Sequence, residues 1–385
     1  MMIPYSRQQI SDSDIQAVSD VLRSDYLTTG PTVERFEAEL CRLTGARHAV
    51  TCSNGTTALH LACLALGVTQ GDIGVTSPIT FLASANCLEF CNGRADFADI
   101  DPATLCLSPE KIEEYVWKFG APKLVIPVDY AGIPADLPRL HALAQKYGFK
   151  IIEDAAHSIG STYTHEGREY ACGSCAHTDM ATFSFHPVKN ITTGEGGAIM
   201  TNDDALAQKL RLLRSHGMTK EPAALTRQDG PWYYEMHEYG YNYRLTDIQC
   251  AIGFSQLKQL PEFKKQRQAL VLRYHELLKD CKDITLPPWP KETSPCFHLY
   301  PIHFTKGETA RLKAYERLTQ ADIRPQVHYF PVHLQPYFKE KYRFFEGSFP
   351  ESEKFYKGAL SLPLFPGLKA EEQEQISSMV LESTK

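Results

Sequence analysis

The sequence predicts an α/β fold, with a large domain around a mostly parallel central sheet and a smaller C-terminal α+β domain. The first reason is a strand–helix–strand pattern of the kind that spans about thirty residues. Lys123–Val128 (KLVIPV) and Phe149–Glu153 (FKIIE) are short apolar runs, typical of strands buried in parallel sheets. Between them, Pro134 near the start and Gly148 past the end bound a helical pattern of apolar residues, namely Leu137, Leu140, Ala144 and Tyr147.

The second reason is that similar short runs recur through the first half of the chain. Further strands are expected at Ala49–Cys52, Gly74–Ser77, Ala95–Asp99, Ala181–Phe185 and Ala198–Thr201. An amphipathic helix is expected around Leu245–Leu260, leading into the helical stretch KKQRQALVLRYHELLKD, and beyond Pro287 proline and aromatic residues become frequent. We therefore expect a large domain over residues 1–255 and a small one over residues 256–385.

Composition excludes several classes of function. The 385 residues carry a formal net charge of −6 and no basic run, which argues against binding to nucleic acid. No apolar stretch is long enough to span a bilayer, and the N-terminal MMIPYSRQQISDSD lacks the apolar region of a secretory signal. We expect a cytoplasmic protein without a membrane partner. Its 11 cysteines, an odd and irregularly spaced set, do not predict a disulfide framework.

Two groups of cysteines have spacings that also occur in metal sites. Cys172 and Cys175, followed by His177, have the spacing of half a zinc site, but a structural zinc needs four ligands and the sequence has no second such pair. Cys87 and Cys91 are one helical turn apart, which suits packing in a core. We expect no metal site.

A polar turn follows one of the predicted strands, at the edge where parallel sheets usually carry their sites. In residues 51–67 (TCSNGTTALHLACLALG), Ser-Asn-Gly-Thr-Thr precedes a helix whose apolar face carries Leu59, Ala62, Cys63 and Leu66. Such a turn presents free N–H groups to an anion, assisted by the helix dipole. The alternative is an ordinary helix cap with nothing bound, which the motif taken alone favours.

Two more stretches follow predicted strands. Asp154 and His157, in IIEDAAHS, come directly after a buried strand, where the aspartate could instead cap a helix and the histidine could be a core residue. In residues 183–197 (FSFHPVKNITTGEGG), Ser184 and Lys189 lie on either side of a His-Pro pair. A lysine held in a partly apolar, phosphate-lined cleft can lose its proton and attack a carbonyl.

Together, the three stretches resemble the fold-type I pyridoxal-phosphate enzymes in their order and spacing. Over nearly the whole chain the sequence resembles the DegT/DnrJ/EryC1/StrS family of sugar aminotransferases. The resemblance rests on LTTGP, SNGTTAL, SPITF, EDAAH, FSFHPVKNITTGEGG, YNYRLTDIQCAIGFSQL, HYFPVH and SLPLFP. It implies a fold-type I aminotransferase with pyridoxal 5'-phosphate as its cofactor and pyridoxamine phosphate as the intermediate form.

The resemblance also implies roles for individual residues. Lys189 would carry the cofactor as a Schiff base, Asp154 would pair with the pyridinium nitrogen, and His157 would touch the ring or its 3-hydroxyl. Phe81 would stack on the ring, and Asn242 would reach the phosphate of the neighbouring subunit, which implies a homodimer with shared active sites. The remaining phosphate ligands would be Thr56, Thr57 and Ser184. Without the resemblance, an equally good reading of Asn242 is a helix cap.

Within the family, ASANC, VDYAG, FSFHPVK and QVHYFPVHLQPYF resemble the aminotransferases of the pseudaminic acid pathway. This implies transfer of an amino group from L-glutamate to C4 of a UDP-linked 4-keto-6-deoxy-N-acetylhexose. The products would be UDP-4-amino-4,6-dideoxy-N-acetyl-β-L-altrosamine and 2-oxoglutarate. The N-terminal segment would contact the substrate, and the expected nucleotide-sugar ligands are Tyr5, Leu27, Thr28, Thr29, Gly30, Gln326, Val327, His328 and Tyr329.

Three alternatives stay open. One is an aminotransferase for a different nucleotide-linked keto sugar. Another is a pyridoxamine-dependent sugar dehydratase of the same fold, although such enzymes typically carry histidine at the position that Lys189 occupies here. The third is a non-catalytic binding or regulatory protein, because a fold alone does not prove an activity, although such a protein could lose Asp154 and Lys189 freely.

Overall fold

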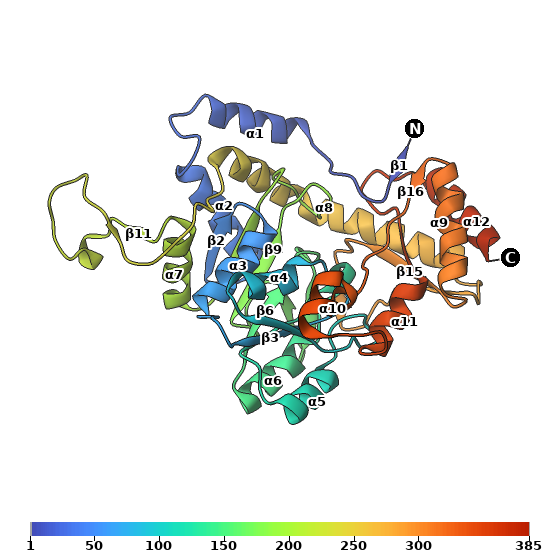
Figure 1. Cartoon of the computed structure of the whole chain (residues 1–385). Coiled ribbons are helices and arrows are strands. Elements are labelled where there is room, and N and C mark those ends of the chain that lie inside the picture. The colour runs from blue at the N-terminus through green and yellow to red at the C-terminus, as the bar shows by residue number, and fades with distance from the viewer. Residues whose placement is uncertain (1, 385) are drawn as a thin grey trace.

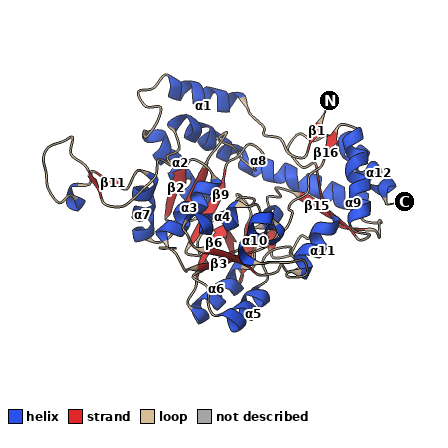
Figure 2. Ribbon diagram, viewed as in Figure 1, coloured by secondary structure: helices blue, strands red, loops and turns tan. Residues whose placement is uncertain are grey.

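The structure is a computed structural model that describes residues 2–384. At its centre is a seven-stranded sheet in the order β2-β10-β9-β6-β5-β3-β4 (Figures 1 and 2). The strands are β2 (His48–Cys52), β3 (Ile73–Thr76), β4 (Arg94–Phe97), β5 (Leu124–Ile126), β6 (Lys150–Asp154), β9 (Met180–Ser184) and β10 (Gly197–Thr201). All neighbours are parallel except β10, which is antiparallel to both β2 and β9. The predicted α/β fold with a mostly parallel sheet is confirmed.

The seven strands are the seven expected ones, with shifts at their ends. The strand that is shortened most is β5, expected over Lys123–Val128 and observed over Leu124–Ile126. Pro127 explains the early end, because it has no N–H to donate to a neighbouring strand. Its carbonyl still accepts a hydrogen bond from the Asp154 N–H at 2.8 Å, which aligns the end of β5 with the end of β6.

The helix between β5 and β6 is α6 (Leu137–Tyr147). Its N-cap is Asp136, and the proline in its first turn is Pro138, so the start expected from Pro134 was a few residues too early. Its end agrees with the prediction, because Gly148 adopts the left-handed conformation (φ 83°) that terminates helices.

Helices cover both faces of the sheet. Side chains alternate along a strand, and the neighbouring residues Ile151 and Ile152 of β6 belong to different hydrophobic clusters. The Ile152 cluster includes residues of α3 (Gly55–Ala65), α4 (Ala83–Phe90) and α7 (Asp204–Arg214), and also Phe338 of the C-terminal part. The Ile151 cluster includes residues of α5 (Pro109–Phe119) and α6.

The longest helix, α8 (Asp247–Leu278), has 32 residues and joins the two parts of the chain. The sequence indicated one helix leading into a second helical stretch, whereas the structure has a single helix that continues through Pro261. Figure 1 shows it crossing the molecule from α1 (Asp12–Leu22) and α2 (Pro31–Thr44) towards the C-terminal elements. Residue 255, the expected domain boundary, lies within α8, and the division into two domains stays a prediction.

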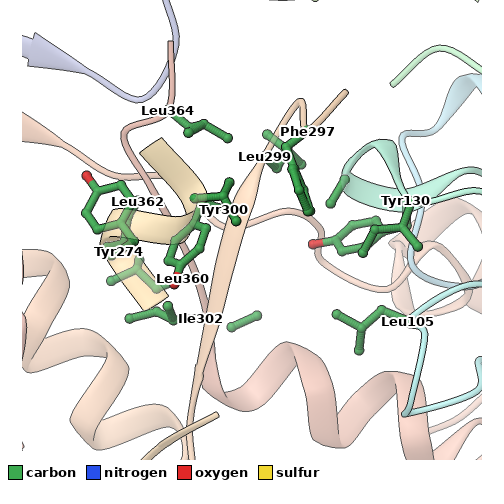
Figure 3. Close-up of a cluster of buried hydrophobic side chains, with 14 of the residues drawn as sticks. Leu105, Tyr130, Tyr274, Phe297, Leu299, Tyr300, Ile302, Leu360, Leu362 and Leu364 are labelled. Carbon is green, nitrogen blue, oxygen red and sulfur yellow. The ribbon is translucent and has the colours of Figure 1, made fainter. Parts of the chain in front are cut away.

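The C-terminal part is built on an antiparallel sheet of β13 (Ile284–Thr285), β15 (Tyr300–Phe304) and β17 (Ala359–Leu362). Figure 3 shows its apolar core, where side chains of β15 and β17 meet Tyr274 of α8. Its helices are α9 (Glu308–Gln320), α10 (Pro336–Tyr342), α11 (Pro350–Gly358) and α12 (Ala370–Ser383). The N-terminal strand β1 (Ile3–Pro4) pairs in parallel with β16 (Ile323–Arg324), so the start of the chain lies against this part (Figure 1).

Two smaller sheets complete the fold. One joins β7 (Thr162–His165), β8 (Arg168–Ala171) and β14 (Thr293–Ser294), and the other joins β11 (Met218–Thr219) and β12 (Glu235–Met236). Short 3-10 helices occur at Tyr130–Gly132, Pro222–Ala224 and Val332–Leu334. Among residues 2–384, no helix combines the length and the apolar character that crossing a membrane requires.

Candidate active site

Lys189 lies in the loop that joins β9 to β10. The loop closes on itself, because the Phe185 N–H donates to the Gly196 carbonyl at 2.8 Å and the Thr193 N–H donates to the Phe185 carbonyl at 3.0 Å. The Lys189 N–H donates to the carbonyl of His186 at 2.9 Å. These bonds fix the backbone of the lysine at the carboxyl end of β9, the edge at which parallel α/β sheets bind ligands.

The neighbours of Lys189 fasten this loop to distant parts of the chain. Asn190 is buried, and its Nδ2 donates to the Cys296 carbonyl at 2.5 Å. The Ser6 hydroxyl donates to the carbonyl of Val188 at 2.8 Å, which brings the N-terminal segment onto the loop. The lysine is therefore held between the central sheet, the N-terminal segment and the C-terminal part.

Asp154 ends β6, directly beside β9, and is 5% exposed. Its Oδ2 accepts a hydrogen bond from the Ser84 hydroxyl at 2.6 Å, and its Oδ1 accepts one from the Ala156 N–H at 3.1 Å. Burial raises the pKa of this carboxyl, although the two hydrogen bonds and the Lys189 ammonium oppose the shift. A further positively charged partner next to Asp154 would therefore stabilise its ionised form.

The buried surroundings of Lys189 disfavour the protonated, charged form of its amine. Desolvation lowers the pKa of its amine from 10.5 to about 8, and the attraction of Asp154 only partly offsets that effect. A lysine of this kind is a far better nucleophile and base near neutral pH than an exposed one.

His157 lies in the same enclosure and is 4% exposed. Its Nε2 is within hydrogen-bond distance (3.2 Å) of the Tyr329 hydroxyl, and its ring centre is 4.5 Å from that of His298. Burial, together with the positive charge of Lys189, holds the pKa of its imidazole well below the usual value, so the ring is neutral. Its Nδ1 is buried and has no partner within residues 2–384, which leaves one polar atom ready for a bound molecule.

Three of the expected substrate ligands meet at this enclosure. The rings of Tyr5 and His328 are 5.1 Å apart, and those of His328 and Tyr329 are 4.9 Å apart. His328 Nδ1 is 2.9 Å from the Ser361 hydroxyl, and burial lowers the pKa of its imidazole to about 3. The ring of Phe81 is 57% exposed and lies 6.2 Å from that of Tyr329, so it presents an open aromatic face.

The N-terminus of α3 forms a cup for an anion. The N–H groups of Gly55 and Thr56 have no hydrogen-bond partner in the part of the chain that the structure describes. Gly55 touches the end of β9, since a Cβ on it would lie 2.8 Å from the Cβ of Ser184. The Thr57 N–H, in contrast, donates to Asn54 Oδ1 at 2.8 Å in a capping box. The cup therefore combines a helix cap with free N–H groups, and these belong to Gly55 and Thr56.

Other expected substrate ligands lie outside the cluster around Lys189. Within residues 2–384, no hydrogen bond joins Leu27, Thr28, Thr29 or Gly30 to that cluster. This turn instead lies against the start of α8, where Asp247 Oδ2 accepts from the Gly30 N–H at 2.7 Å and so helps to cap α2. Gln326 is closer to the cluster, and its side-chain Oε1 accepts from the Val327 N–H at 2.9 Å. Substrate contacts by these residues stay a prediction.

Asn242 is exposed, and its side chain has no hydrogen bond in the described chain. It does not cap α8, because Thr246 does so in a capping box with Gln249. Its backbone pairs with Ser215, and the carbonyl of the next residue, Tyr243, accepts from the Ser53 N–H at 2.8 Å. Asn242 thus stands near the α3 cup with a free amide.

Three residues of the site were missed by sequence reasoning: Ser84, Asn190 and His298. Ser84 and His298 contact predicted site residues that are distant in the sequence, namely Asp154 and His157. Asn190 supports its neighbour Lys189 through a bond to a distant backbone carbonyl. No local sequence pattern therefore marks these three residues. Ser84 had the best available signal, because it follows PITF by only a few residues. His298 packs against His157 with its ring tilted by 44°, and it lies in the aromatic C-terminal stretch, where histidines are common and uninformative.

The cysteines of the CxxC motif are buried rather than arranged around a ligand. Cys172 lies with Asp129 and Glu153, and the ligand atoms of the three are within 4.8 Å of one another. Asp129 Oδ2 accepts from the Ser158 hydroxyl at 2.6 Å, and the Glu153 carboxyl accepts from the Gly173 N–H at 3.1 Å. Burial raises the pKa of both carboxyls and of the thiol, which favours their protonated, uncharged forms.

The chain is similar to known proteins in both sequence and structure. The model of the DegT/DnrJ/EryC1/StrS aminotransferase family matches residues 8–381. The spore coat polysaccharide biosynthesis protein SpsC of Bacillus subtilis is 35% identical over 387 aligned residues, which cover 100% of this chain and 97% of SpsC. Among solved structures, PseC of Helicobacter pylori, an aminotransferase involved in the biosynthesis of pseudoaminic acid, has a TM-score of 0.91 at 30% identity and covers 100% of this chain and 99% of its own.

A second solved neighbour is Spr1654 of Streptococcus pneumoniae. In its PMP form it has a TM-score of 0.90 at 27% identity, covering 99% of this chain and 99% of its own. In its PLP form the TM-score is again 0.90, at 26% identity. These likenesses cover the whole chain rather than one part of it.

Proposed function

Because the chain belongs to the DegT/DnrJ/EryC1/StrS aminotransferase family, whose solved members use pyridoxal phosphate, we propose that it aminates a UDP-linked sugar. The amino group passes from L-glutamate to C4 of a UDP-linked 4-keto-6-deoxy-N-acetylhexose. The products are UDP-4-amino-4,6-dideoxy-N-acetyl-β-L-altrosamine and 2-oxoglutarate. The observation that carries the proposal is the Lys189 amine, with its pKa lowered to about 8, in one enclosure with Asp154, His157 and the aromatic ligands Tyr329 and Tyr5.

The residues present fit pyridoxal phosphate. The unpartnered Nδ1 of His157 and the free N–H groups at the start of α3 are polar groups that await a ligand. Phe81 offers an exposed ring for stacking, and buried Asp154 has room for one more donor. When bound, the cofactor supplies a protonated pyridine ring that acts as an electron sink.

The chain's own groups perform the proton transfers. Lys189 accepts the proton from Cα of the amino donor and later delivers it, as a general base and then a general acid. Its lowered pKa suits both tasks near neutral pH. Asp154 stays ionised opposite a positive partner, and the Ser84 hydroxyl fixes the direction of its carboxylate. Neutral His157 and the ring of Tyr329 help to exclude water from this reaction space.

The nucleotide sugar is assigned to the side of the enclosure formed by Tyr5, Gln326, Val327, His328 and Tyr329. These residues come from the two ends of the chain, which meet there through the β1–β16 pairing. His328 is fixed from both sides, because its carbonyl accepts from a buried tyrosine hydroxyl at 2.6 Å and its ring bonds to Ser361. Such a preorganised aromatic wall suits a sugar ring and its acetamido group.

A panel of substrates tests this proposal. The holoenzyme is incubated with L-glutamate and UDP-, GDP- or dTDP-linked 4-keto-6-deoxy sugars, with and without the N-acetyl group. We expect the UDP-linked N-acetyl sugar to be aminated at C4, as followed by mass spectrometry and NMR of the product, and no amine with the Lys189→Ala control. Preference for another nucleotide or another amine configuration would contradict the assigned sugar, and no amine from any sugar would contradict aminotransferase activity on this class.

We also propose that two chains form a homodimer with shared active sites. The segment between α7 and α8 projects from the body of the molecule as a long arm containing β11 (Figure 1). It exposes large apolar side chains, with Trp232 exposed by 72% and Tyr239 by 80%, a pattern typical of an interface. Asn242 lies at the base of this arm with a free amide, and in the proposed dimer it serves the phosphate bound by the partner.

Complementation between two defective chains tests the shared site. In a mixed dimer of Lys189→Ala and Asn242→Ala chains, the site with an intact lysine receives an intact Asn242 from the other chain. We expect that site to be active, so the mixed dimer should exceed both parents in turnover at limiting pyridoxal phosphate. The measurement uses dimers purified through two different tags, with a Lys189→Ala and wild-type pairing as the control for half-site activity. If pure mixed dimers show no recovery, Asn242 acts within its own chain.

A further inference from the structure

A small cavity lies where the N-terminal segment, the loop that carries Lys189 and the long helix α8 meet. Its volume is about 10 Å³, which is room for a single small ion or water molecule. The residues around it include Arg7 of the N-terminal segment, Lys189 of the loop and Arg267 of α8, and no aspartate or glutamate lines it. The cavity is therefore lined by cationic residues without a balancing carboxylate.

The N-terminal segment is tied down on both sides of Arg7. On one side, the Ser6 hydroxyl donates to the carbonyl of Val188 at 2.8 Å. On the other side, Nε2 of Gln256 on α8 donates to the Gln9 carbonyl at 2.9 Å. Arg7 is exposed, yet these two bonds hold its backbone at the cavity.

Arg267 is a buried cation without a counterion. It is 1% exposed, and its Nη1 donates to two neutral groups, the carbonyls of Phe297 and Leu364, both at 3.1 Å. Its Nε is buried and has no hydrogen-bond partner within residues 2–384. Burial lowers the pKa of this guanidinium to about 10, so it is still protonated at neutral pH. A buried charge of this kind is costly unless it is paired.

The surroundings of Arg267 do not supply the missing negative charge. The Cys296 thiol could offset it only as a thiolate, and burial raises the pKa of that thiol to about 11, so it is neutral near pH 7. Arg7 has no ion pair in the described chain either, which leaves two guanidiniums unpaired at one cavity. A water molecule would suit Asn190 Oδ1, which is buried without a partner there, but it would leave the charge of Arg267 unbalanced.

We propose that this cavity binds one small monovalent anion, of the size of chloride, between Arg7 and Arg267. Guanidinium groups bind anions through charge-assisted hydrogen bonds. The bound anion fastens the N-terminal segment to α8 and to the loop of Lys189. The site is distinct from the nucleotide-sugar side of the enclosure, because none of the expected substrate ligands lines it and its volume is too small for a phosphate group.

Thermal unfolding of the full-length holoenzyme tests the site, with sodium chloride compared against sodium gluconate at equal ionic strength. Gluconate is too large for the cavity. Chloride should raise Tm to a plateau, because a ligand that binds only the folded state stabilises it. In Arg7→Gln the chloride concentration needed for half of this effect should rise at least about 10-fold, because one charged partner is lost.

Arg23→Gln is the matched control, since Arg23 is an exposed arginine of the N-terminal part that does not line the cavity. It should respond to chloride as the wild type does, and any general effect of the two salts is the same in both variants. Equal responses of the wild type and Arg7→Gln overturn the proposal. So does a wild type whose Tm shows no saturable dependence on chloride.

Bromide locates the anion directly by its anomalous scattering. Crystals of the full-length protein grown with bromide should show one anomalous peak in the cavity of the wild type and none in Arg7→Gln. Arg267→Met, which removes the buried charge, should also lack the peak and should melt at a Tm that does not depend on chloride. If that variant does not fold, Arg7→Gln answers the same question. A cavity that holds only water in the wild type, or the same peak in Arg7→Gln, overturns the proposal.

Discussion

Replacing Lys189 by alanine is expected to abolish transamination, with kcat lowered by at least about 10⁴-fold. Two functions vanish at once, the covalent attachment of the cofactor and the base that moves the substrate proton. Nothing nearby substitutes for them. Asp154 is acceptor-only when ionised, and His157 is buried and neutral with a strongly lowered pKa. The variant should still fold, because the loop is held by backbone bonds and by Asn190 rather than by the lysine side chain.

The readout combines turnover with attachment of the cofactor. Borohydride treatment and mass spectrometry should find the cofactor linked to the wild type but not to Lys189→Ala or to the charge-preserving control Lys189→Arg. In the cofactor-free wild type, uptake of pyridoxal phosphate requires the neutral amine. Its rate should therefore rise with pH, reach half of its maximum near pH 8 and level off above that, because burial lowers the pKa of Lys189 to about 8. A rate that keeps rising well beyond pH 9, or retained activity in Lys189→Ala, would exclude the assigned role.

Local sequence patterns predicted the elements whose structure depends mainly on residues close together in the sequence. The seven strands of the central sheet are short apolar runs, and burial on both faces leaves such runs few other structures. The order β2-β10-β9-β6-β5-β3-β4 could not be obtained in this way, because strand order depends on contacts between distant segments. The antiparallel direction of β10 follows from its short link to β9, the loop that carries Lys189.

The main error in the fold concerned the long helix. A proline usually ends a helix or bends it, and the change of pattern near Pro261 suggested two helical stretches. The structure keeps one helix, α8, because its two ends are packed on different parts of the molecule. Tertiary packing can outweigh the cost of a proline inside a helix, which is about 3 kcal/mol relative to alanine.

The site was predictable where residues follow strands and unpredictable where they meet across the fold. Asp154 and Ser184 end strands and Lys189 lies in the loop after Ser184, so the alternation of strands and helices already places them at one edge of the sheet. Ser84 and His298 touch their partners over separations that no spacing rule covers. Thr57, expected among the phosphate ligands, uses its N–H to cap α3 through Asn54, and its contact with a phosphate stays a prediction. Helix capping and anion binding use the same N–H groups, and the sequence does not show which N–H group serves which purpose.

Replacing Asp154 by asparagine has the second largest expected effect. A carboxylate beside the pyridine nitrogen of the cofactor favours the protonated ring. An opposite charge within about 4–6 Å of a titratable group shifts the pKa of that group by about 1–3 units. Loss of the charge should therefore lower kcat by about 10- to 1000-fold at neutral pH. The amide has nearly the same shape, and its oxygen can still accept from Ser84 or Ala156, so the geometry is retained. Because burial raises the pKa of this carboxyl, its charge lowers the stability of the cofactor-free protein above pH 4, and removing it should leave the melting temperature unchanged or raised.

The pH dependence separates this electrostatic role from a merely structural one. In the variant, protonation of the ring must come from solvent, so the deficit in kcat relative to the wild type should shrink as pH falls. Ser84→Ala is the matched control, because it removes the 2.6 Å hydrogen bond to Asp154 and keeps the charge. It should reduce kcat far less and leave the shape of the pH profile as in the wild type. If Asp154→Asn loses activity equally at every pH, or turns over like the wild type, Asp154 does not hold the proton of the pyridine nitrogen.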